Sequence, residues 1–286
     1  MIHGTTGLIR RALLLLLTLA AVTLLCATAV FAKPVNLIPV YGGDVLQPYY
    51  GRIENGAVYL PFAAFAAANG TPELTEGGSE GLPALVASGE ELSVSVYPGH
   101  AFLSSGDRYF YAQGLPAEER DGVLYVPARL LCPAYGLQPV FNEKELTLTL
   151  VREYRPAASG EEVYDEESLY WLSHIIYAEA GIGEPFDGMI AVGNVVLNRV
   201  RDLSAPNTIK EVIFDNRFGV QFSPAYTPVI YEEPTELAVI AAKICLEGYS
   251  IDPDILFFYS PRYVTAEWIE TTRLYKFTIG NHRFFA

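Results

Sequence analysis

A polar stretch at residues 152–163 divides the chain into two parts with different residue patterns, and this division limits the possible folds more than any other feature. The stretch contains proline, serine and glycine and suits an exposed linker. Before it, short alternating apolar segments are broken by glycine, proline and asparagine, whereas after it apolar residues recur at helical spacing. We therefore expect an α+β chain with two domains of different class, at residues 33–151 and 164–286.

The first 32 residues are typical of an export signal. Arg10 and Arg11 precede an apolar run at residues 12–30, and small residues that suit cleavage follow at its end. We therefore expect an exported protein. The apolar run is about as long as the shortest membrane-spanning helices, so an uncleaved N-terminal membrane anchor is the alternative to cleavage.

Charge and cysteine content exclude several classes of partner and site. The formal net charge is −14, and nucleic acid is not an expected partner because phosphate binding needs clustered lysine and arginine. Outside the apolar run the cysteines are Cys132 and Cys245, one in each half of the chain, which is no disulfide framework. The four histidines show no ligand spacing with the cysteines. No metal site and no cofactor are expected.

The first part of the chain contains an internal repeat. The stretch GAVYLPFAAFAAANG from Gly56 returns from Gly122 as GVLYVPARLLCPAYG, and each copy predicts a turn, a strand that ends in Tyr-x-Pro and a short helix. Residues 146–150 then alternate as a half-buried strand. This mostly-β arrangement over residues 36–151 resembles the copper amine oxidase N-terminal-like domain, a small domain of exported bacterial proteins that carries no oxidase chemistry. Contact with a wall polymer or a partner protein is the role that we expect of it.

The second part reads as mainly helical. Asp165 is a good N-cap for a helix that reaches Glu179, and the run from Pro185 to Val200 is apolar nearly all round, as in a helix at the centre of a domain. Shorter elements follow: a capping box at Thr208 and Glu211, a helix at residues 234–247, a strand at 255–259 and a hairpin at 277–285 around Gly280-Asn281.

Several blocks of this part are similar, in order and spacing, to the SleB/CwlJ-type cell wall hydrolases, the group of the spore cortex-lytic enzymes. The blocks are YAEAGIGEPFDGMIAVGNVVLNRV (177–200), PNTIKEVIF (206–214), QFSP (221–224), FFYSP (257–261), TAEWI (265–269) and IGNHRFF (279–285). The resemblance implies a lysozyme-like, lytic-transglycosylase-type fold with a small sheet, peptidoglycan glycan strands as the substrate, and Glu179 as the catalytic glutamate. It also places the exported protein at the cell wall or spore envelope.

The residues around Glu179 agree with a mechanism that needs one carboxyl group. Its neighbours Tyr177, Ala178 and Ala180 are small or apolar, which raises the pKa of a carboxyl group towards that of a general acid. A hydrolysing glycosidase usually needs a second carboxylate. The nearest, Glu184, would point away from Glu179 on an unbroken helix, although the intervening glycines argue against such a helix. The spacing of the two glutamates is also one residue longer than the family pattern, which leaves the role of Glu184 less defined.

Other side chains are candidates for contact with the glycan. We predict substrate binding by Gln221, Ser223, Tyr259 and Glu184, each of which also has a structural interpretation. For Glu184 this alternative is a place in the first turn of the second helix, which it would stabilise. Two other acids are candidates for the second catalytic carboxylate. Asp187 is a weak candidate because the helix dipole alone explains an acid at a helix start, and Asp215 lies on a more distant loop. Four further residues are interpreted as structural. Asn198 and Arg199 close the buried helix, Trp268 is expected in the core, and His282 is expected to have its ring nitrogens satisfied.

The sequence therefore predicts an exported lytic transglycosylase that cuts between N-acetylmuramic acid and N-acetylglucosamine, in wall remodelling or spore cortex lysis. Two alternatives stay open. One is a hydrolytic muramidase, which would release a reducing end. The other is a peptidoglycan-binding protein without catalysis, although such a protein has no need of a general acid at Glu179.

Overall fold

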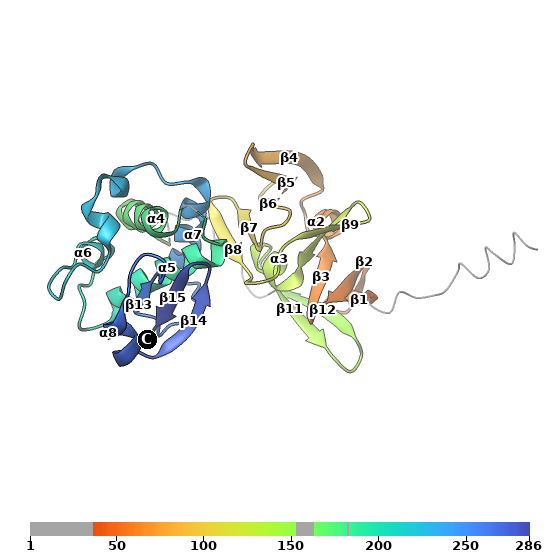
Figure 1. Cartoon of the computed structure of the whole chain (residues 1–286). Coiled ribbons are helices and arrows are strands. Elements are labelled where there is room, and N and C mark those ends of the chain that lie inside the picture. The colour runs from red at the N-terminus through yellow and green to blue at the C-terminus, as the bar shows by residue number, and fades with distance from the viewer. Residues whose placement is uncertain (1–36, 153–162, 182) are drawn as a thin grey trace, which may run out of the picture.

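The computed structural model describes residues 37–152, 163–181 and 183–286, and the chain is a mixed α+β protein over these ranges (Figure 1). Strands with two short helices precede residue 152, and helices with a small sheet follow residue 163, as predicted. The predicted export signal and nearly all of the predicted linker lie outside the described residues. Within those residues no helix has both the length and the apolar character needed to cross a bilayer.

Two sheets make up the N-terminal part. The first has seven strands in the order β11-β12-β1-β2-β3-β10-β9, and the second has five in the order β4-β5-β6-β7-β8. The first sheet consists of β1 (Leu37–Gly42), β2 (Val45–Glu54), β3 (Ala57–Pro61), β9 (Glu118–Arg120), β10 (Val123–Pro127), β11 (Leu137–Asn142) and β12 (Thr147–Arg152). The second consists of β4 (Glu73–Ser79), β5 (Leu82–Ser88), β6 (Ser93–Val96), β7 (Phe102–Ser105) and β8 (Arg108–Tyr111). The predicted alternation is confirmed for Leu148 and Leu150 of β12, which are buried, but the predicted first residue, Leu146, lies before the strand and is exposed.

The sequence repeat appears in space as a pair of matched units. In the first copy β3 leads into helix α2 (Phe62–Ala68), and in the second β10 leads into α3 (Ala128–Ala134). The two strands are antiparallel neighbours, and the tyrosine of each copy lies opposite the proline of the other, Tyr59 opposite Pro127 and Tyr125 opposite Pro61. The repeated motif therefore pairs with itself across a local two-fold relation.

The C-terminal part consists of short helices around one buried helix. Its elements are α4 (Glu166–Ala180), α5 (Phe186–Arg201), α6 (Ile209–Ile213), the 3₁₀ turns η2 (Ser223–Tyr226) and η3 (Pro228–Tyr231), α7 (Glu236–Leu246), β13 (Phe257–Tyr259), α8 (Glu267–Thr272), β14 (Tyr275–Ile279) and β15 (His282–Phe285). Three strands form a sheet in the order β13-β15-β14. The predicted strand at 255–259 is shorter than expected, because pairing before Phe257 is limited to one bond from the Leu256 amide to the Phe285 carbonyl, 2.9 Å long.

The predicted helix caps are present. Asp165 accepts a hydrogen bond of 2.8 Å from the Ser168 amide at the start of α4, and Thr208 accepts one of 3.3 Å from the Glu211 amide at the start of α6. Helix α5 is buried over most of its length, as its apolar surface predicts, and Asn198 near its end donates to the backbone carbonyls of Asp252 and Ile255. Asn198 is therefore a structural residue, as interpreted from the sequence.

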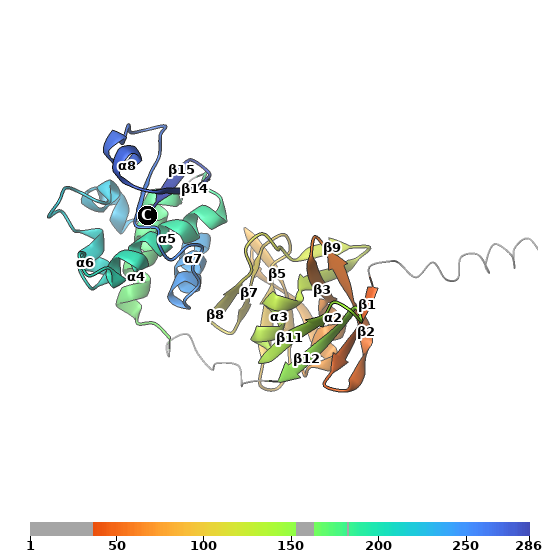
Figure 2. The ribbon, with the colours of Figure 1, turned by 90° about the horizontal axis from the view of Figure 1, so that it is seen from below.

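The two parts of the chain share one hydrophobic core. Phe102 of β7 and Leu82 of β5 lie in the same buried cluster as the apolar residues of α4, α5 and α7. The ring centroid of Phe102 is 4.9 Å from that of Phe186, the first residue of α5. In two perpendicular views β8 is the strand that lies beside α7 (Figures 1 and 2).

Charged side chains reinforce this contact. Arg108 of β8 donates from Nε to Glu247, just after α7, over 2.7 Å, and its pKa is raised by that hydrogen bond. The Tyr111 hydroxyl donates to Asp187 in the first turn of α5. Asp187 was interpreted as an acid that serves only the helix dipole, and that interpretation is incomplete because its carboxylate joins the two parts of the chain.

Candidate active site

Glu179 lies in a cavity of about 620 Å³ in the C-terminal part. It is the penultimate residue of α4, which ends at the C-cap Gly181. Gly183, with a φ of 77°, then turns the chain back towards α5 in a backbone region that favours glycine. The cavity is lined by Tyr177, Ala178, Glu179, Gly181, Glu184, Gln221, Ser223, Pro224, Val229, Glu232, Phe258, Tyr259, Ser260, Tyr263, Val264, Ala266, Ile269, Asn281 and His282. All five predicted site residues are among them, so the structure brings together side chains that lie up to 80 positions apart.

The carboxyl group of Glu179 is largely withdrawn from water. Burial raises its pKa from 4.5 to about 7, because removal from water disfavours the charged form. Within the described residues no hydrogen bond or ion pair reaches this carboxyl group. The rise agrees with the expectation from its apolar neighbours. A carboxyl group with this pKa is partly protonated near neutral pH and can both give and take a proton.

Glu184 also faces the cavity, but its oxygens are already engaged. The backbone amide of Asn281 donates to them over 3.0 and 3.1 Å, and the Asn281 side chain donates over 2.7 Å. Only 4% of the Glu184 side chain is exposed. Gly280 makes this approach possible, since a Cβ atom there would lie 2.0 Å from the carboxylate. Glu184 therefore holds the β14–β15 turn against the end of α4.

The structural interpretation of Glu184 was wrong in one respect. The sequence suggested a residue in the first turn of the second helix, whereas α5 begins at Phe186 with Pro185 as its N-cap. Glu184 precedes the cap and binds the hairpin instead of the helix. The signal for this contact was not local, because its partner lies 97 residues further along the chain.

The third glutamate in the cavity was not a candidate in the sequence. Glu232 follows η3 and is exposed at the edge of the cavity. It lies more than 50 positions from Glu179. The three glutamates thus differ in their surroundings: burial raises the pKa of Glu179, Glu184 is bound by Asn281, and Glu232 is exposed.

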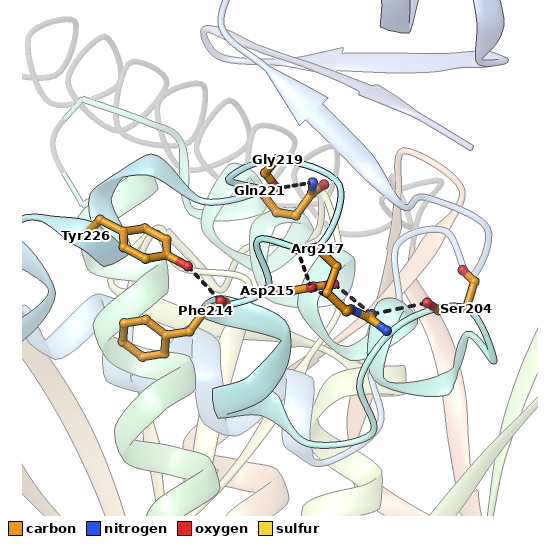
Figure 3. Close-up of polar contacts among 7 residues, drawn as sticks. All are labelled: Ser204, Phe214, Asp215, Arg217, Gly219, Gln221 and Tyr226. Carbon is orange, nitrogen blue, oxygen red and sulfur yellow. Dashed lines mark hydrogen bonds and ion pairs between the residues drawn. The ribbon is translucent and has the colours of Figure 1, made fainter.

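Gln221 and Ser223 also line the cavity. The Gln221 amide nitrogen donates to the Gly219 carbonyl over 2.7 Å, which fixes the side chain within its own loop (Figure 3). Ser223 is the first residue of η2. Tyr226 anchors the same segment through a bond of 2.6 Å from its hydroxyl to the Phe214 carbonyl (Figure 3). The loop therefore presents Gln221 and Ser223 in a defined position.

Tyr259 lines the cavity with its hydroxyl group bound elsewhere. That hydroxyl donates to Glu270, which also accepts from Arg283 over 2.6 Å. The hydrogen bond to the Glu270 carboxylate is the main reason that the pKa of Tyr259 is raised. Tyr259 is therefore held between a strand and α8, and its ring is the part available to a ligand.

His282 and Trp268 do not fit their structural interpretations. His282 is 6% exposed and was expected to have its ring nitrogens satisfied, yet no residue in the described ranges forms a hydrogen bond with its Nδ1, which lies 3.7 Å from Glu184. Burial lowers the pKa of His282, so the ring is neutral at pH 7 and this approach is not a salt bridge. Trp268 was expected in the core, but it is 55% exposed because α8 buries none of its residues.

Asp215 does not act as a partner for Glu179 in this arrangement. It lines a neighbouring cavity and forms an ion pair of 2.8 Å with Arg217 (Figure 3). The side-chain hydrogen bond from Arg217 lowers the pKa of Asp215. Across the described ranges, no three histidine, cysteine or acidic side chains cluster in a way that could hold a metal ion.

We expect the change Glu184→Gln to weaken the fold more than the chemistry. Loss of charge-assisted bonds to Asn281 should lower the free energy of unfolding by about 1 to 2 kcal/mol, while glycan cleavage stays within about tenfold of wild type. Chemical denaturation and a product-release assay measure the two effects. Glu233→Gln, an exposed change outside the cavity, is the control. Complete loss of cleavage in a folded Glu184→Gln protein would instead make Glu184 the second catalytic carboxylate.

Comparison with known proteins relates the C-terminal part to one family. Residues 183–285 match the family model described as Cell Wall Hydrolase. The spore cortex-lytic enzyme of Bacillus cereus is 34% identical over 121 residues, which cover 42% of this chain and 45% of that protein. The spore cortex-lytic enzyme of Oceanobacillus iheyensis is 30% identical over 129 residues, 45% of each chain. The chain thus spans less than half the length of these relatives.

A solved structure is also similar. The catalytic domain of the germination-specific lytic transglycosylase SleB from Bacillus anthracis is 33% identical, with 97% of that domain and 43% of this chain covered and a TM-score of 0.39. The family model begins four residues after Glu179, so the role of Glu179 rests on its geometry and on the sequence block around it. The likeness of the N-terminal part to the copper amine oxidase N-terminal-like domain stays a prediction. Residues 183–285 therefore match the cell wall hydrolase family, and the C-terminal part of the chain is similar to the spore cortex-lytic enzymes.

Proposed function

We propose that this protein is an exported peptidoglycan lytic transglycosylase with Glu179 as its single acid and base. The observation that carries the proposal is the buried carboxyl group of Glu179, whose pKa is raised to about 7 at the wall of an open cavity. The relatives named as spore cortex-lytic enzymes and the solved lytic transglycosylase domain support the same activity. The lysozyme-like arrangement of residues 164–286 is part of this proposal.

The proposed reaction uses the Glu179 proton twice. Protonated Glu179 first gives its proton to the glycosidic oxygen between N-acetylmuramic acid and N-acetylglucosamine, and the bond from that oxygen to muramyl C1 breaks. The Glu179 carboxylate then takes the proton of the muramyl C6 hydroxyl as its oxygen bonds to C1. The products are a free N-acetylglucosamine hydroxyl and a 1,6-anhydro ring, and Glu179 is protonated again. No water is consumed.

The other lining residues have binding roles in this proposal. Gln221, Ser223 and the ring of Tyr259 contact the glycan, and Glu184 positions the turn that closes one end of the cavity. The substrate is the glycan strand of peptidoglycan, in the vegetative wall or the spore cortex. The N-terminal part, residues 33–151, is assigned to contact with the wall or a partner protein.

A hydrolytic muramidase is the second candidate, and Glu232 is the observation that favours it. An exposed carboxylate in the same cavity as a buried carboxyl group is the pairing that a hydrolysing glycosidase uses to activate water. One observation argues against the muramidase. Within the described residues no hydrogen bond joins Glu232 to a second element of the fold, whereas hydrolysis needs a fixed position for the attacking water.

Mass spectrometry of soluble muropeptides separates the candidates. The purified chain is incubated with vegetative and with cortex peptidoglycan, and we expect anhydro-muropeptides, which are lighter by one water than the hydrolytic products. Reducing-end products that disappear in Glu232→Gln would establish the muramidase. Release of nothing from either wall, with binding retained, would leave a peptidoglycan-binding protein without catalysis.

A further inference from the structure

A second cavity continues from the one that holds Glu179. Its volume is about 540 Å³, and it shares Gln221 with the Glu179 cavity. A smaller cavity of about 260 Å³ joins the two, since it shares Ile269 with the first and Trp268 with the second. A linear polymer bound across Glu179 can therefore extend past Gln221 into this second cavity.

Aromatic side chains are exposed in the second cavity. Trp268 is 55% exposed and Phe218 is 85% exposed, although both are large apolar residues that folding usually buries. The Trp268 ring is kept in place by Phe257, with ring centroids 5.8 Å apart. An exposed aromatic face held by its neighbours is suited to stack on the apolar face of a sugar ring.

Two arginines line the same cavity, and Asp202 and Asp215 interact electrostatically with Arg199 without forming a direct ion pair with it in the described residues. Arg199, at the end of α5, donates from Nε to the Leu256 carbonyl over 2.7 Å, and its guanidinium lies 5.1 Å from the Phe257 centroid. Burial lowers its pKa to about 10, so it remains charged at neutral pH. Arg273 lies over the rings of Phe257 and Trp268 at 4.3 and 5.1 Å. Neither arginine forms an ion pair in the described part of the chain.

The acids of this cavity are occupied by other groups. Asp215 receives two hydrogen bonds from Arg217, of 2.8 and 2.9 Å, and Arg217 also donates to the Ser204 carbonyl over 3.2 Å (Figure 3). Asp202 accepts from the Ser204 amide over 2.8 Å. The lining thus holds two arginines and two aspartates, and both aspartates already accept hydrogen bonds from other groups. The guanidinium groups of Arg199 and Arg273, which form no ion pair in the described residues, are therefore the charged donors available to an anionic ligand.

We infer that this second cavity is a subsite for a muramyl unit that carries a carboxylate. The sugar ring stacks on Trp268, and the carboxylate binds between the guanidinium groups of Arg199 and Arg273, whose forked donors match its two oxygens. The carboxylate comes either from the lactyl group of a muramyl unit without a peptide or from the stem peptide. The inference rests on the proposed function, because it extends the glycan site of Glu179.

Binding to defined glycans tests the subsite. All proteins carry Glu179→Gln so that the ligands stay intact, and isothermal titration calorimetry compares soluble glycan strands with stem peptides, strands stripped to the free lactyl carboxylate, and uncharged N-acetylglucosamine oligomers. Arg273→Gln is the test variant, because Arg273 is exposed and its loss should leave the fold intact. Arg120→Gln removes a positive charge from β9, which lines neither cavity, and is the matched control.

We expect at least one acidic glycan to bind about tenfold more tightly than the uncharged oligomer, the effect of one charge-assisted hydrogen bond. Arg273→Gln should remove this preference and Arg120→Gln should keep it, while Trp268→Leu should weaken the binding of all ligands. The glycan that shows the preference identifies the source of the carboxylate. A preference that survives Arg273→Gln, or that is absent from the start, overturns the subsite but not the proposed function. Binding of no glycan, with no release of muropeptides by the wild type, overturns both.

Discussion

Replacement of Glu179 by glutamine should lower peptidoglycan cleavage about a thousandfold, the contribution of a well-placed general acid. Glutamine has nearly the same shape but carries no acidic proton for the glycosidic oxygen. Release of soluble muropeptides measures the rate, and circular dichroism checks the fold. Glu233→Gln should cleave at the wild-type rate. A folded Glu179→Gln protein that retained cleavage within tenfold of wild type would remove Glu179 from the chemistry.

The same residue should set the pH dependence of the wild-type enzyme. Glu179 must be protonated before the first step, and its pKa is about 7. The protonated fraction, and with it kcat/KM, should therefore be greatest below pH 7 and fall about tenfold for each unit of pH above that value. A rate that rose steadily from pH 6 to pH 9 would contradict the assignment of Glu179 as the acid.

Glu179→Gln should also stabilise the protein, and more so at high pH. Because the pKa of Glu179 is raised from 4.5 to about 7, the folded state binds this proton more tightly than the unfolded state. The free energy of unfolding of the wild type therefore decreases as pH rises between these two values. Above about pH 7 the Glu179 carboxyl group lowers it no further. The stability gained by Glu179→Gln should be roughly 2 kcal/mol larger at pH 8.5 than at pH 5.5.

Urea denaturation of both proteins at the two pH values measures this difference. Both pH values lie above the isoelectric point of about 4.7, so they avoid the low solubility of a protein near zero net charge. A stability difference that does not change with pH would mean that the Glu179 carboxyl group is not withdrawn from water. This result is independent of any substrate, so it separates the environment of Glu179 from its catalytic role.

Local sequence signals predicted the elements of the fold well. The caps Asp165 and Thr208, the alternation in β12 and the turn at Gly280-Asn281 each depend on residues a few positions apart, and all four are present. The Tyr-x-Pro repeat likewise predicted two strand-helix units. Such signals are reliable because backbone geometry and capping are decided within one or two turns of chain.

Contacts between distant segments were not predicted from the sequence. The exposure of Trp268 follows from the position of α8, which buries none of its residues, and nothing in the residues next to Trp268 indicates it. The Nδ1 atom of His282 lies 3.7 Å from Glu184, which is almost a hundred positions away in the sequence. Glu232 reaches the cavity through the two 3₁₀ turns before it. Tertiary packing decides which distant residues lie close together, and local patterns in a single sequence do not predict it.

The core shared between the five-stranded sheet and the helices has a consequence for how the proposed enzyme would meet an insoluble substrate. Phe102 against Phe186, and Arg108 against Glu247, attach the N-terminal part to the helices behind the cavity. Any surface that binds the N-terminal part therefore also sets the orientation of the cavity opening. A wall polymer is a fixed meshwork, and an enzyme aimed in this way would work along strands of one orientation and leave those that cross them.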